Sequence, residues 1–378
     1  MRVAFIYDRV NKWGGAERIL MALHEIWPEA PLYTSVYNHQ TALWAKVFPK
    51  VIPSFVNNFP FAIRHELYAS LMPLAFESFT FDDYDVVISV TSEAAKGVIT
   101  KPKTLHICYC LTPTRYLWSH YTDYFRGELF QWLTKPVVAY LREWDKIAGQ
   151  RPDYYLAISE NVRERIKKYY GRDSKVIYPP TGLATSRQSL AISLEDKRTR
   201  RYMLDASGFF LVVSRLVPYK RIDIAIKAFN ELGLSLKVVG IGSEMGKLRR
   251  MAKDNIEFLG ELTDDALLRY YQECQALVFP QDEDLGLVSI EAQACGKPVV
   301  AFRGGGALET VIPGKTGEFF YPQTSSALIE TVKIFKSSAY QADDCRKNAK
   351  IFDKEKFKAR FKNIVEKLWH QYLKTVMS

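Results

Sequence analysis

The sequence predicts an α/β protein built from two halves, each a parallel β-sheet with helices on both faces. Short apolar runs alternate with segments of helical periodicity over almost the whole chain. Strands that are separated by helices pair in parallel, and helices then cover both sides of the sheet. A break at 181–207 divides the alternation into two halves. The strand-like runs lie at 2–8, 31–37, 85–90, 105–110 and 154–159 before the break, and at 209–215, 236–242, 276–280 and 298–302 after it.

The break and the end of the chain set the expected organisation. Residues 181–207 carry no run of helical or strand period and end in a basic cluster, so they are expected to form a linker or loop. The last segment, 354–378, is predicted to form one amphipathic helix. Its apolar residues at helical spacing are Phe357, Phe361, Ile364, Val365, Leu368 and Leu373.

The stretch 278–306 carries the strongest chemical signal. An apolar strand is expected to end in a short acidic loop containing Glu283 and Gly286, which opens into a helix bearing Glu291. Gly296 is expected to stop that helix before a second strand, which runs into a triple glycine. A strand, a loop and a helix N-terminus form an anion pocket, because the first helical turn leaves its N–H groups unpaired. Two carboxylates beside such a pocket suit a nucleotide-sugar, which has phosphates in the middle and hydroxyls at both ends.

The spacing of the two glutamates argues against a glycosidase. Eight positions of mostly helical chain separate Glu283 and Glu291 by on the order of 10 Å along the axis. A retaining glycosidase pair needs a separation of about 5 Å and an inverting pair somewhat more. The spacing therefore favours two carboxylates that grip different parts of one long ligand. The alternative is that both are solvated acids near a helix start that stabilise its dipole.

A glycine pair near the start of the chain is a second candidate for ligand contact. Gly14 and Gly15 follow the first strand and precede a helical run at 16–26. Glycines let the backbone approach a ligand closely, and the new helix offers N–H groups. The pattern is not the GxGxxG dinucleotide fingerprint, so a dehydrogenase is disfavoured. The alternative is a simple turn.

Two cations open the second half. Arg215 and Lys220 flank a turn containing Pro218, directly after a strand. Cations at the end of a strand can neutralise a diphosphate and stabilise it as a leaving group. In isolation such a pair would be read as ordinary surface charge.

Composition excludes several classes of protein. The chain has 378 residues and a net charge of +10, and the basic excess is spread over both halves rather than concentrated in a stripe typical of a nucleic-acid binder. No apolar run reaches the roughly 18 residues of a membrane span. The N-terminus has no signal-peptide pattern, so we expect a cytoplasmic protein. The five cysteines lack metal-ligand spacing, and no Asp-x-Asp motif ends a strand, so we expect reduced thiols and no metal.

These motifs together resemble the family 4 retaining glycosyltransferases, whose GT-B fold places two Rossmann-like domains on either side of a central cleft. The resemblance covers nearly the whole chain and starts from Glu-x7-Glu, with Gly286 three residues after the first glutamate. Two further stretches are most similar to a bacterial branch of O-antigen mannosyltransferases, at 105–118 and 176–180. The other stretches that carry the resemblance are Gly14 to Glu17, Ser214 to Arg221, Val239 to Gly242 and Gly304 to Glu309.

The resemblance implies domains and residue roles. It implies an acceptor domain at 1–185, joined by a terminal helix 354–378 that crosses back to it, and a donor domain at 205–353. It further implies that Arg215 and Lys220 bind the diphosphate, that Glu283 contacts sugar hydroxyls and that Glu291 contacts ribose hydroxyls. The glycine loop at 14–15 would face the donor phosphates and the acceptor. Backbone N–H groups would bind phosphate at Leu285, Gly286 and Leu287, and the backbone would pass close to the nucleoside at Gly240 and Gly242.

One position departs from the family pattern. Many members carry His-x-Pro where this chain has Leu111-Thr-Pro113, and that histidine contacts the donor sugar. His106 lies five residues earlier and is not expected to replace it. Transfer in this family is thought to proceed on one face of the sugar, with the donor phosphate taking the acceptor proton. The departure therefore puts the sugar-site chemistry in question without excluding transfer.

Two aromatic segments have open interpretations. Residues 54–79 are rich in aromatic side chains and low in charge, which fits an interfacial helix touching lipid or, as we favour, a helix packed on its own sheet. Tyr116, Trp118, His120 and Tyr121 fit either an acceptor groove or the core.

The sequence thus predicts a retaining, metal-independent hexosyltransferase with a nucleotide-diphosphate sugar as donor and no cofactor. The branch resemblance points to mannose from GDP-mannose, and to a glycan or lipid-linked acceptor in surface-polysaccharide synthesis. The expected location is cytoplasmic, with peripheral contact at the inner membrane face. The alternatives are a non-catalytic nucleotide-sugar-binding protein, or a nucleotide-sugar hydrolase or epimerase of the same fold.

Overall fold

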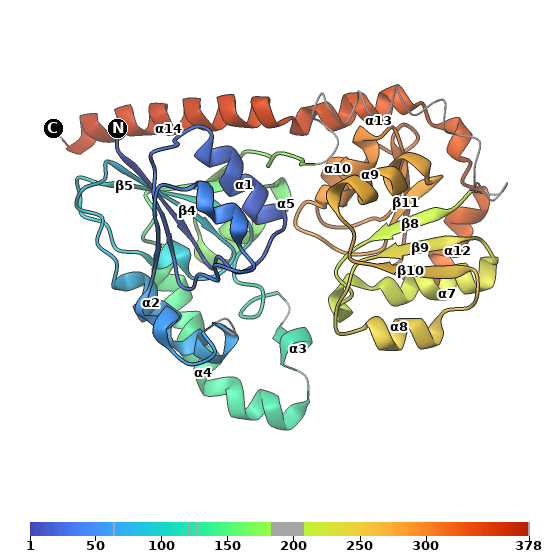
Figure 1. Ribbon diagram of the computed structural model, residues 1–378, viewed down its shortest axis with the longest axis horizontal. Helices are drawn as coiled ribbons and strands as arrows, with labels where there is room; N and C mark the ends of the chain where they lie inside the picture. Colours follow the sequence, from blue (N-terminus) through green and yellow to red (C-terminus); the bar gives the residue numbers. More distant parts are fainter. Residues whose placement is uncertain (63–64, 120, 126, 183–207, 377–378) are drawn as a thin grey trace. The chain divides into compact units, whose positions relative to one another are not determined.

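The computed structural model describes residues 1–62, 65–119, 121–125, 127–182 and 208–376 (Figure 1). The described chain divides into two compact units. One unit contains residues 1–180 and 355–378, and the other contains residues 181–354. The division falls at the start of the predicted break, and most of that break, 183–207, lies outside the described residues.

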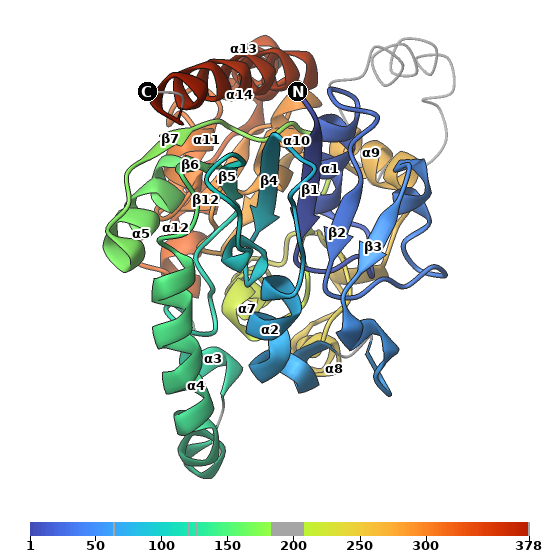
Figure 2. The ribbon, with the colours of Figure 1, turned by 90° about the vertical axis from the view of Figure 1, so that its left-hand side faces the viewer.

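The first unit is built on a seven-stranded, all-parallel sheet with the order β3-β2-β1-β4-β5-β6-β7, which Figure 2 shows nearly side by side. Its strands are β1 Val3–Tyr7, β2 Leu32–Thr34, β3 Val51–Pro53, β4 Val86–Thr91, β5 Leu105–Cys110, β6 Tyr154–Ala157 and β7 Ser174–Val176. Its α-helices are α1 Gly15–His24, α2 Met72–Glu77, α3 Tyr121–Tyr124, α4 Glu128–Ala148, α5 Glu160–Tyr170 and α14 Lys354–Val376.

The second unit repeats this plan with a six-stranded, all-parallel sheet in the order β10-β9-β8-β11-β12-β13. Its strands are β8 Phe210–Val213, β9 Leu236–Val239, β10 Ile256–Gly260, β11 Ala276–Phe279, β12 Val299–Phe302 and β13 Gly317–Phe320. Its α-helices are α7 Ile222–Leu232, α8 Met245–Met251, α9 Asp264–Glu273, α10 Leu287–Ala294, α11 Ala307–Thr310, α12 Ser325–Ile334 and α13 Ala342–Ala349.

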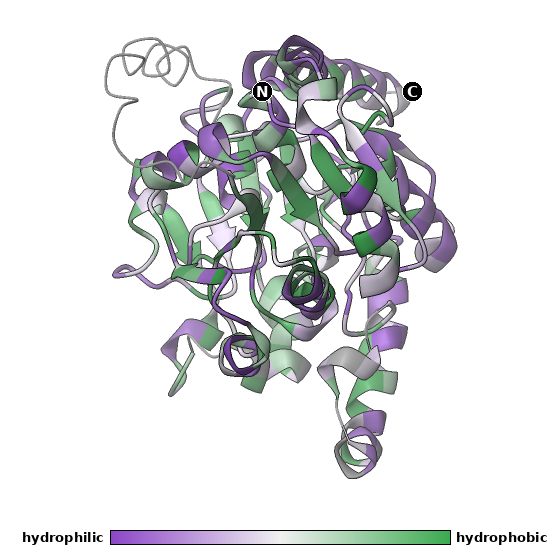
Figure 3. Cartoon of the chain, turned by 90° about the vertical axis from the view of Figure 1, so that its right-hand side faces the viewer, coloured by the Kyte–Doolittle hydropathy of each residue, from purple (hydrophilic) through white to green (hydrophobic). Residues whose placement is uncertain are grey.

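The central strands are continuous apolar runs because helices cover both faces of each sheet. Every residue of β1, β4, β5 and β11 is buried. Figure 3 shows the hydrophobic colour concentrated on the strands, while the helices also carry hydrophilic residues. All nine predicted strands are confirmed. The structure adds four strands that the sequence did not predict, and each of them is the edge of a sheet: β3, β7, β10 and β13.

The C-terminal helix α14, which its periodicity predicts, packs on the sheet of the first unit. Phe357 and Phe361 are buried, and their ring centroids lie 6.0 and 5.2 Å from that of Tyr109 on β5. Lys358 adds an ion pair with Glu25 at 3.0 Å. The terminal helix therefore completes the first unit although residues 181–354 separate it from that unit in sequence.

The aromatic segment 54–79 is not one helix. It forms two short 3-10 segments, Phe55–Asn58 and His65–Leu71, followed by α2. Met72 and Phe76 on α2 are buried in the core of the first unit, which confirms that part of the segment packs on its own sheet. Other apolar side chains of the segment, among them Phe61 and Leu67, stay exposed.

The structure also describes the five cysteines and allows a search for membrane-spanning helices. The five cysteines are free; four are buried, whereas Cys295 is only half-buried. Among the described residues, no helix combines the length and the apolarity needed to cross a membrane.

Each sheet has one point where the strand order reverses. In the first unit the chain runs from β1 outward to β3 and then returns to the other side of β1 with β4. In the second unit it runs from β8 outward to β10 and returns beside β8 with β11. Loops diverge at such a switch point, and ligands of parallel α/β sheets bind there, outside the carboxyl ends of the strands. The four loops after β1, β4, β8 and β11 are therefore the places to look for a site.

Candidate active site

An ion pair spans the switch point of the second unit. Lys220, at the end of the 3-10 turn Pro218–Lys220 that follows β8, pairs with Glu283 in the loop after β11. The Lys220 side chain is 6% exposed and the Glu283 side chain 17%. Two of the three residues predicted to be catalytic are thus brought together from positions 63 residues apart.

Tyr219 lies between the two predicted cations. Its hydroxyl accepts a hydrogen bond from Nη2 of Arg215 at 2.6 Å, and the Lys220 ammonium lies 5.2 Å from the centre of its ring. Arg215, the third predicted catalytic residue, is exposed. Sequence reasoning missed Tyr219, although an aromatic residue between two candidate phosphate-binding cations was a usable signal. Tyr219 thus orients Arg215 through its hydroxyl and Lys220 through its ring, because a cation is attracted to the face of an aromatic ring.

The triple glycine holds the loop that carries Glu283. The Gly306 N–H donates to the Glu283 carbonyl at 2.8 Å. A Cβ on Gly305 would lie 2.4 Å from the Glu283 carbonyl oxygen, and a Cβ on Gly306 would lie 2.2 Å from Cα of Leu285. These separations are too short for any side chain, so the two loops can pack together only because glycine stands at both positions.

Gly286 begins helix α10 as the sequence predicts. It has φ +86, where glycine is favoured, and a Cβ there would lie 2.7 Å from the ring of Phe279. Leu285 before it is buried and Leu287 opens the helix as its first residue. Gly296, with φ +78, follows the helix end at the predicted place. The predicted contact of these backbone N–H groups with phosphate stays a prediction.

Gly240 and Gly242 have a structural reason to be glycine that differs from the predicted approach to a nucleoside. A Cβ on Gly240, which has φ +130, would lie 1.9 Å from the Ser214 carbonyl oxygen, and one on Gly242 would lie 2.3 Å from that of Leu216. The Leu216 N–H donates to the Ile241 carbonyl at 2.9 Å. The loop after β9 thus packs directly on the loop after β8 and supports the segment that carries Arg215 and Lys220.

Glu291 is buried and points to a neighbouring helix. It is 4% exposed, and its Oε2 accepts a hydrogen bond from the hydroxyl of Tyr271 on α9 at 2.9 Å. Burial, reinforced by the charge of Glu291, raises the pKa of Tyr271 well above its ordinary value. Tyr271 therefore stays a hydrogen-bond donor that fixes this carboxylate. The predicted contact of Glu291 with ribose hydroxyls stays a prediction.

Gln281 is a further candidate that sequence reasoning missed. It follows β11 by two positions and is 2% exposed. Among the described residues, its amide oxygen has no hydrogen-bond partner. A buried acceptor without a donor costs free energy, which a ligand that donates a hydrogen bond would recover.

The first unit places the glycine pair and Leu111 at strand ends. Gly14 precedes α1, and the carboxylate of Glu17 in the first turn accepts a hydrogen bond from the Tyr7 hydroxyl at 2.6 Å. Leu111 follows β5, and its N–H donates to the Thr91 carbonyl at 2.8 Å. His106 is fully buried with Nε2 2.9 Å from the Ser89 hydroxyl, and burial lowers its pKa to about 3. It therefore stays neutral and does not replace a group at Leu111.

The aromatic residues after β5 are mainly structural. The indole N–H of Trp118 donates to Asp145 at 2.7 Å, and its ring stacks on Tyr169 with centroids 5.2 Å apart. Tyr116 and Tyr121 pack on the small cluster around Leu117. His120 lies outside the described residues.

Within the described residues, no three His, Cys, Asp or Glu side chains gather where they could hold a metal ion.

Comparison with known proteins defines the class of the second unit. Residues 199–352 match the family model "Glycosyl transferases group 1". This segment contains the Lys220–Glu283 pair and the triple glycine. The match lies within the second unit and covers less than half of the chain.

Curated relatives and solved structures extend the comparison. The chain is 32% identical over 187 residues to the "GDP-mannose-dependent alpha-(1-6)-phosphatidylinositol monomannoside mannosyltransferase" of Mycolicibacterium smegmatis, covering 45% of this chain and 49% of that protein. It is 32% identical over 153 residues to the "Uncharacterized glycosyltransferase MJ1178" of Methanocaldococcus jannaschii, covering 39% of this chain and 44% of the relative. The chain thus spans about half the length of the curated relatives that it matches.

The solved structures cover the whole fold. Anabaena Alr3699/HepE in complex with UDP is 21% identical with a TM-score of 0.66, covering 97% of this chain and 100% of that one. Sucrose-phosphate synthase from Thermosynechococcus elongatus is 18% identical with a TM-score of 0.73, covering 98% of this chain and 100% of the other. These matches confirm the predicted GT-B fold of two Rossmann-like α/β domains.

Proposed function

We propose that this protein is a retaining, metal-independent glycosyltransferase that moves a hexose from a nucleotide-diphosphate sugar to a glycan or lipid-linked acceptor. The observation that carries the proposal is the Lys220–Glu283 pair, because it lies at the switch point of a sheet within the segment that matches glycosyl transferases group 1. A nucleotide-sugar needs cations for its diphosphate and a carboxylate for its sugar hydroxyls, and this pair offers one of each.

The chemistry follows from what these groups can do. When the bond between sugar and diphosphate breaks, negative charge builds on the leaving phosphate oxygen. Lys220 would stabilise that charge most strongly because it is almost buried, and Arg215 would add a second cation from the surface. Glu283 would accept hydrogen bonds from sugar hydroxyls and hold the sugar in place.

The names of the relatives support mannose as the transferred sugar. Four of the matched proteins are named as GDP-mannose-dependent mannosyltransferases. Together with the resemblance of 105–118 to the O-antigen mannosyltransferase branch, they favour GDP-mannose as donor and surface-polysaccharide assembly as the pathway. UDP-sugars are the competing donors, because the solved Anabaena Alr3699/HepE structures hold UDP or UDP-glucose.

A thermal-unfolding panel tests the donor. The protein is melted alone and with GDP, GDP-mannose, UDP, UDP-glucose or ADP, each with and without EDTA. A ligand at about 100 times its Kd adds roughly 2.7 kcal/mol to the free energy of unfolding, so GDP and GDP-mannose are expected to raise Tm by several degrees, unaffected by EDTA. No shift with any nucleotide would refute the proposed function, and a shift that EDTA abolishes would refute metal independence.

Leu111 supports one alternative function. An apolar side chain after β5, where the resembling family often has histidine, favours a protein that binds nucleotide-sugars without transferring them. Nucleotide binding with neither transfer to glycoside acceptors nor release of free sugar would establish this alternative. Release of free sugar to water alone would instead indicate a hydrolase.

Exposed apolar side chains of the first unit support peripheral contact with a membrane. Helix α4, which extends away from its sheet in Figures 1 and 2, carries Trp132 at 70% exposure and also exposes Leu133, Val137 and Tyr140. The segment 54–79 also exposes Phe61 and Leu67. Exposed aromatic and aliphatic side chains on a basic protein suit the interface of an anionic bilayer.

Vesicle flotation tests this contact. The double variant Trp132→Ser/Leu133→Ser is expected to bind phosphatidylglycerol vesicles at least fivefold more weakly than the wild type. The matched control is Ile334→Ser on α12, which removes a side chain that is 78% exposed in the other unit. Equal binding of the double variant and the control would contradict α4 as the contact.

A further inference from the structure

The switch point of the first unit carries its own cation–carboxylate pair. Arg9 lies two positions after the end of β1, and Glu93 lies two positions after the end of β4. Nη1 of Arg9 is 2.5 Å from Oε1 of Glu93, and their side chains are 17% and 21% exposed. The pair thus occupies the same place in its sheet as Lys220–Glu283 does in the other: the cation follows the first strand of the unit and the carboxylate follows the strand that returns beside it.

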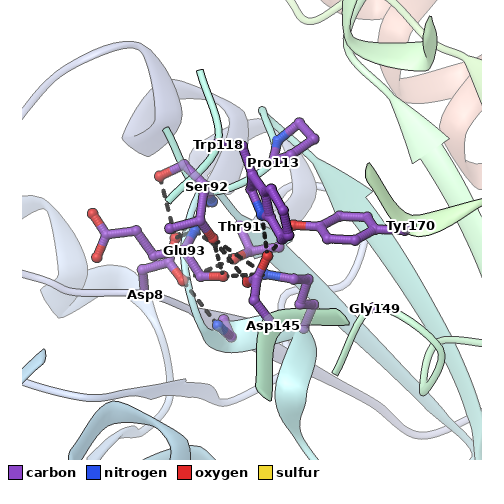
Figure 4. Close-up of polar contacts among 12 residues, drawn as sticks. Asp8, Thr91, Ser92, Glu93, Pro113, Trp118, Asp145, Gly149 and Tyr170 are labelled. Atoms are coloured by element: carbon purple, nitrogen blue, oxygen red, sulfur yellow. Dashed lines mark hydrogen bonds and ion pairs between the residues drawn. The ribbon is translucent and has the colours of Figure 1, made fainter. Parts of the chain in front are cut away.

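A buried aspartate fixes the turn that presents Glu93. Asp8 is 4% exposed and accepts hydrogen bonds from the backbone N–H groups of Ser92, Glu93 and Ala95 at 2.7, 3.0 and 2.9 Å. The Thr91 hydroxyl adds a hydrogen bond at 2.8 Å (Figure 4). The Asp8 carboxylate, at the end of the neighbouring strand β1, therefore fixes the backbone of the turn after β4. This restricts the position of Glu93, which the turn carries.

A second buried pair ties the loop after β5 to the same turn. Nζ of Lys96 lies 2.6 Å from Oδ1 of Asp145, and both side chains are almost fully buried. Asp145 also accepts hydrogen bonds from Thr114 at 2.9 Å and from Trp118 at 2.7 Å (Figure 4). The Glu93 carbonyl accepts a hydrogen bond from Lys96, which joins the two networks. Hydrogen bonds and ion pairs thus connect the segments that follow β1, β4 and β5, and the Arg9–Glu93 pair lies on two of these segments.

The loop that carries Arg9 also carries a partly exposed tryptophan. Trp13 is 46% exposed, its ring centroid lies 6.1 Å from that of Trp44, and the Arg18 guanidinium lies 5.9 Å from the ring centre. A pyranose carries hydroxyl groups around its rim, so it suits a rigid pair that offers one hydrogen-bond donor and one acceptor.

We propose that Arg9 and Glu93 form a sugar-binding subsite in the first unit, with Glu93 accepting and Arg9 donating hydrogen bonds to neighbouring hydroxyls of a pyranose. Trp13 is included in this subsite because it lies four positions after Arg9 in the same loop. This proposal rests on the proposed function, for which the subsite binds the acceptor. It assigns the acceptor's recognition to residues that belong neither to the glycine loop at 14–15 nor to the donor site.

Saturation-transfer NMR tests the subsite without turnover. The probes are methyl α-D-mannopyranoside, methyl α-D-glucopyranoside and methyl α-D-galactopyranoside at millimolar concentration. At least one glycoside is expected to receive saturation in the wild type, and Glu93→Gln and Trp13→Ala are each expected to reduce it at least fivefold. Trp13→Ala removes an exposed side chain outside the buried networks, so it remains informative if Glu93→Gln folds poorly.

The matched control is Glu77→Gln, which alters an ion pair of similar exposure in the same unit. Arg151 lies 2.6 Å from Glu77, and their side chains are 23% and 26% exposed. The control is expected to keep the wild-type signal. Absence of transfer to all three glycosides in the wild type, or undiminished transfer in both variants, would overturn the subsite. Nucleotide-induced Tm shifts are expected to be unchanged in the variants, so a failed subsite and a failed donor site give different results.

Discussion

Lys96→Met is expected to destabilise the protein by about 3–5 kcal/mol, because it leaves the buried Asp145 carboxylate without its counter-charge. Both side chains are at most 2% exposed and 2.6 Å apart. Burial opposes the charge on Lys96, yet Asp145 holds the pKa of this lysine above its ordinary value. Urea unfolding would measure the loss as a lower midpoint with an unchanged m-value.

Two further variants make this result specific. Lys146→Met breaks the pair with Glu143 on the same helix, where the side chains are 51% and 71% exposed, and it is expected to cost less than about 1 kcal/mol. Lys96→Met/Asp145→Leu removes both buried charges and is expected to recover part of the loss, because no uncompensated charge remains. Equal costs for Lys96→Met and Lys146→Met would contradict a buried pair.

Lys220→Ala and Glu283→Gln are each expected to lower sugar transfer at least tenfold, which corresponds to about 1.4 kcal/mol or more of transition-state stabilisation. Lys220→Ala removes the buried cation that would face the leaving diphosphate, and Glu283→Gln removes the carboxylate that would hold sugar hydroxyls. Steady-state kinetics with the donor identified by thermal unfolding would measure both. We expect Lys220→Ala to weaken binding of the free nucleoside diphosphate, and Glu283→Gln to leave it almost unchanged.

The controls distinguish a loss of catalysis from a loss of stability caused by breaking an ion pair. Lys333→Ala and Glu330→Gln alter an exposed pair on α12 of the same unit, with 55% and 74% exposure, and should keep wild-type kinetics. Because Lys220 and Glu283 also stabilise each other, the Tm of each variant is measured beside its activity. Wild-type transfer by both site variants in folded protein would remove the site assignment.

The sequence predicted the interior of each sheet and missed the edges for one physical reason. An interior strand such as β4 is covered by helices on both faces, so all its residues are apolar or small and it stands out as a run. The edge strands contain half-buried and exposed residues; β7, Ser174–Val176, includes an exposed lysine. Their pairing is decided by the neighbouring strand rather than by their own pattern.

Some residues of the candidate site were likewise indicated by the sequence, and others are shown only by the structure. Lys220, Glu283 and Gly286 could be found because residue type and spacing after a strand indicate their chemistry. Tyr219 was missed although it lies between two candidate cations in the sequence. Gln281 could not be found, since only its burial distinguishes it from an ordinary loop residue. The sequence indicated that Gly240 and Gly242 are constrained positions. It did not show that the backbone of the loop after β8 leaves no room for a side chain there, which the structure does.

Local patterns in the chain thus determined two parallel α/β sheets, the central strands and the loops that carry charge. Burial and periodicity act over a few residues, so the sequence shows them directly. The tertiary structure alone decided which loops meet, because strand order brings β1 beside β4 and β8 beside β11 across long stretches of chain. Each of these contacts placed a cation against a carboxylate, Arg9 with Glu93 and Lys220 with Glu283, at the two points where parallel sheets hold their ligands.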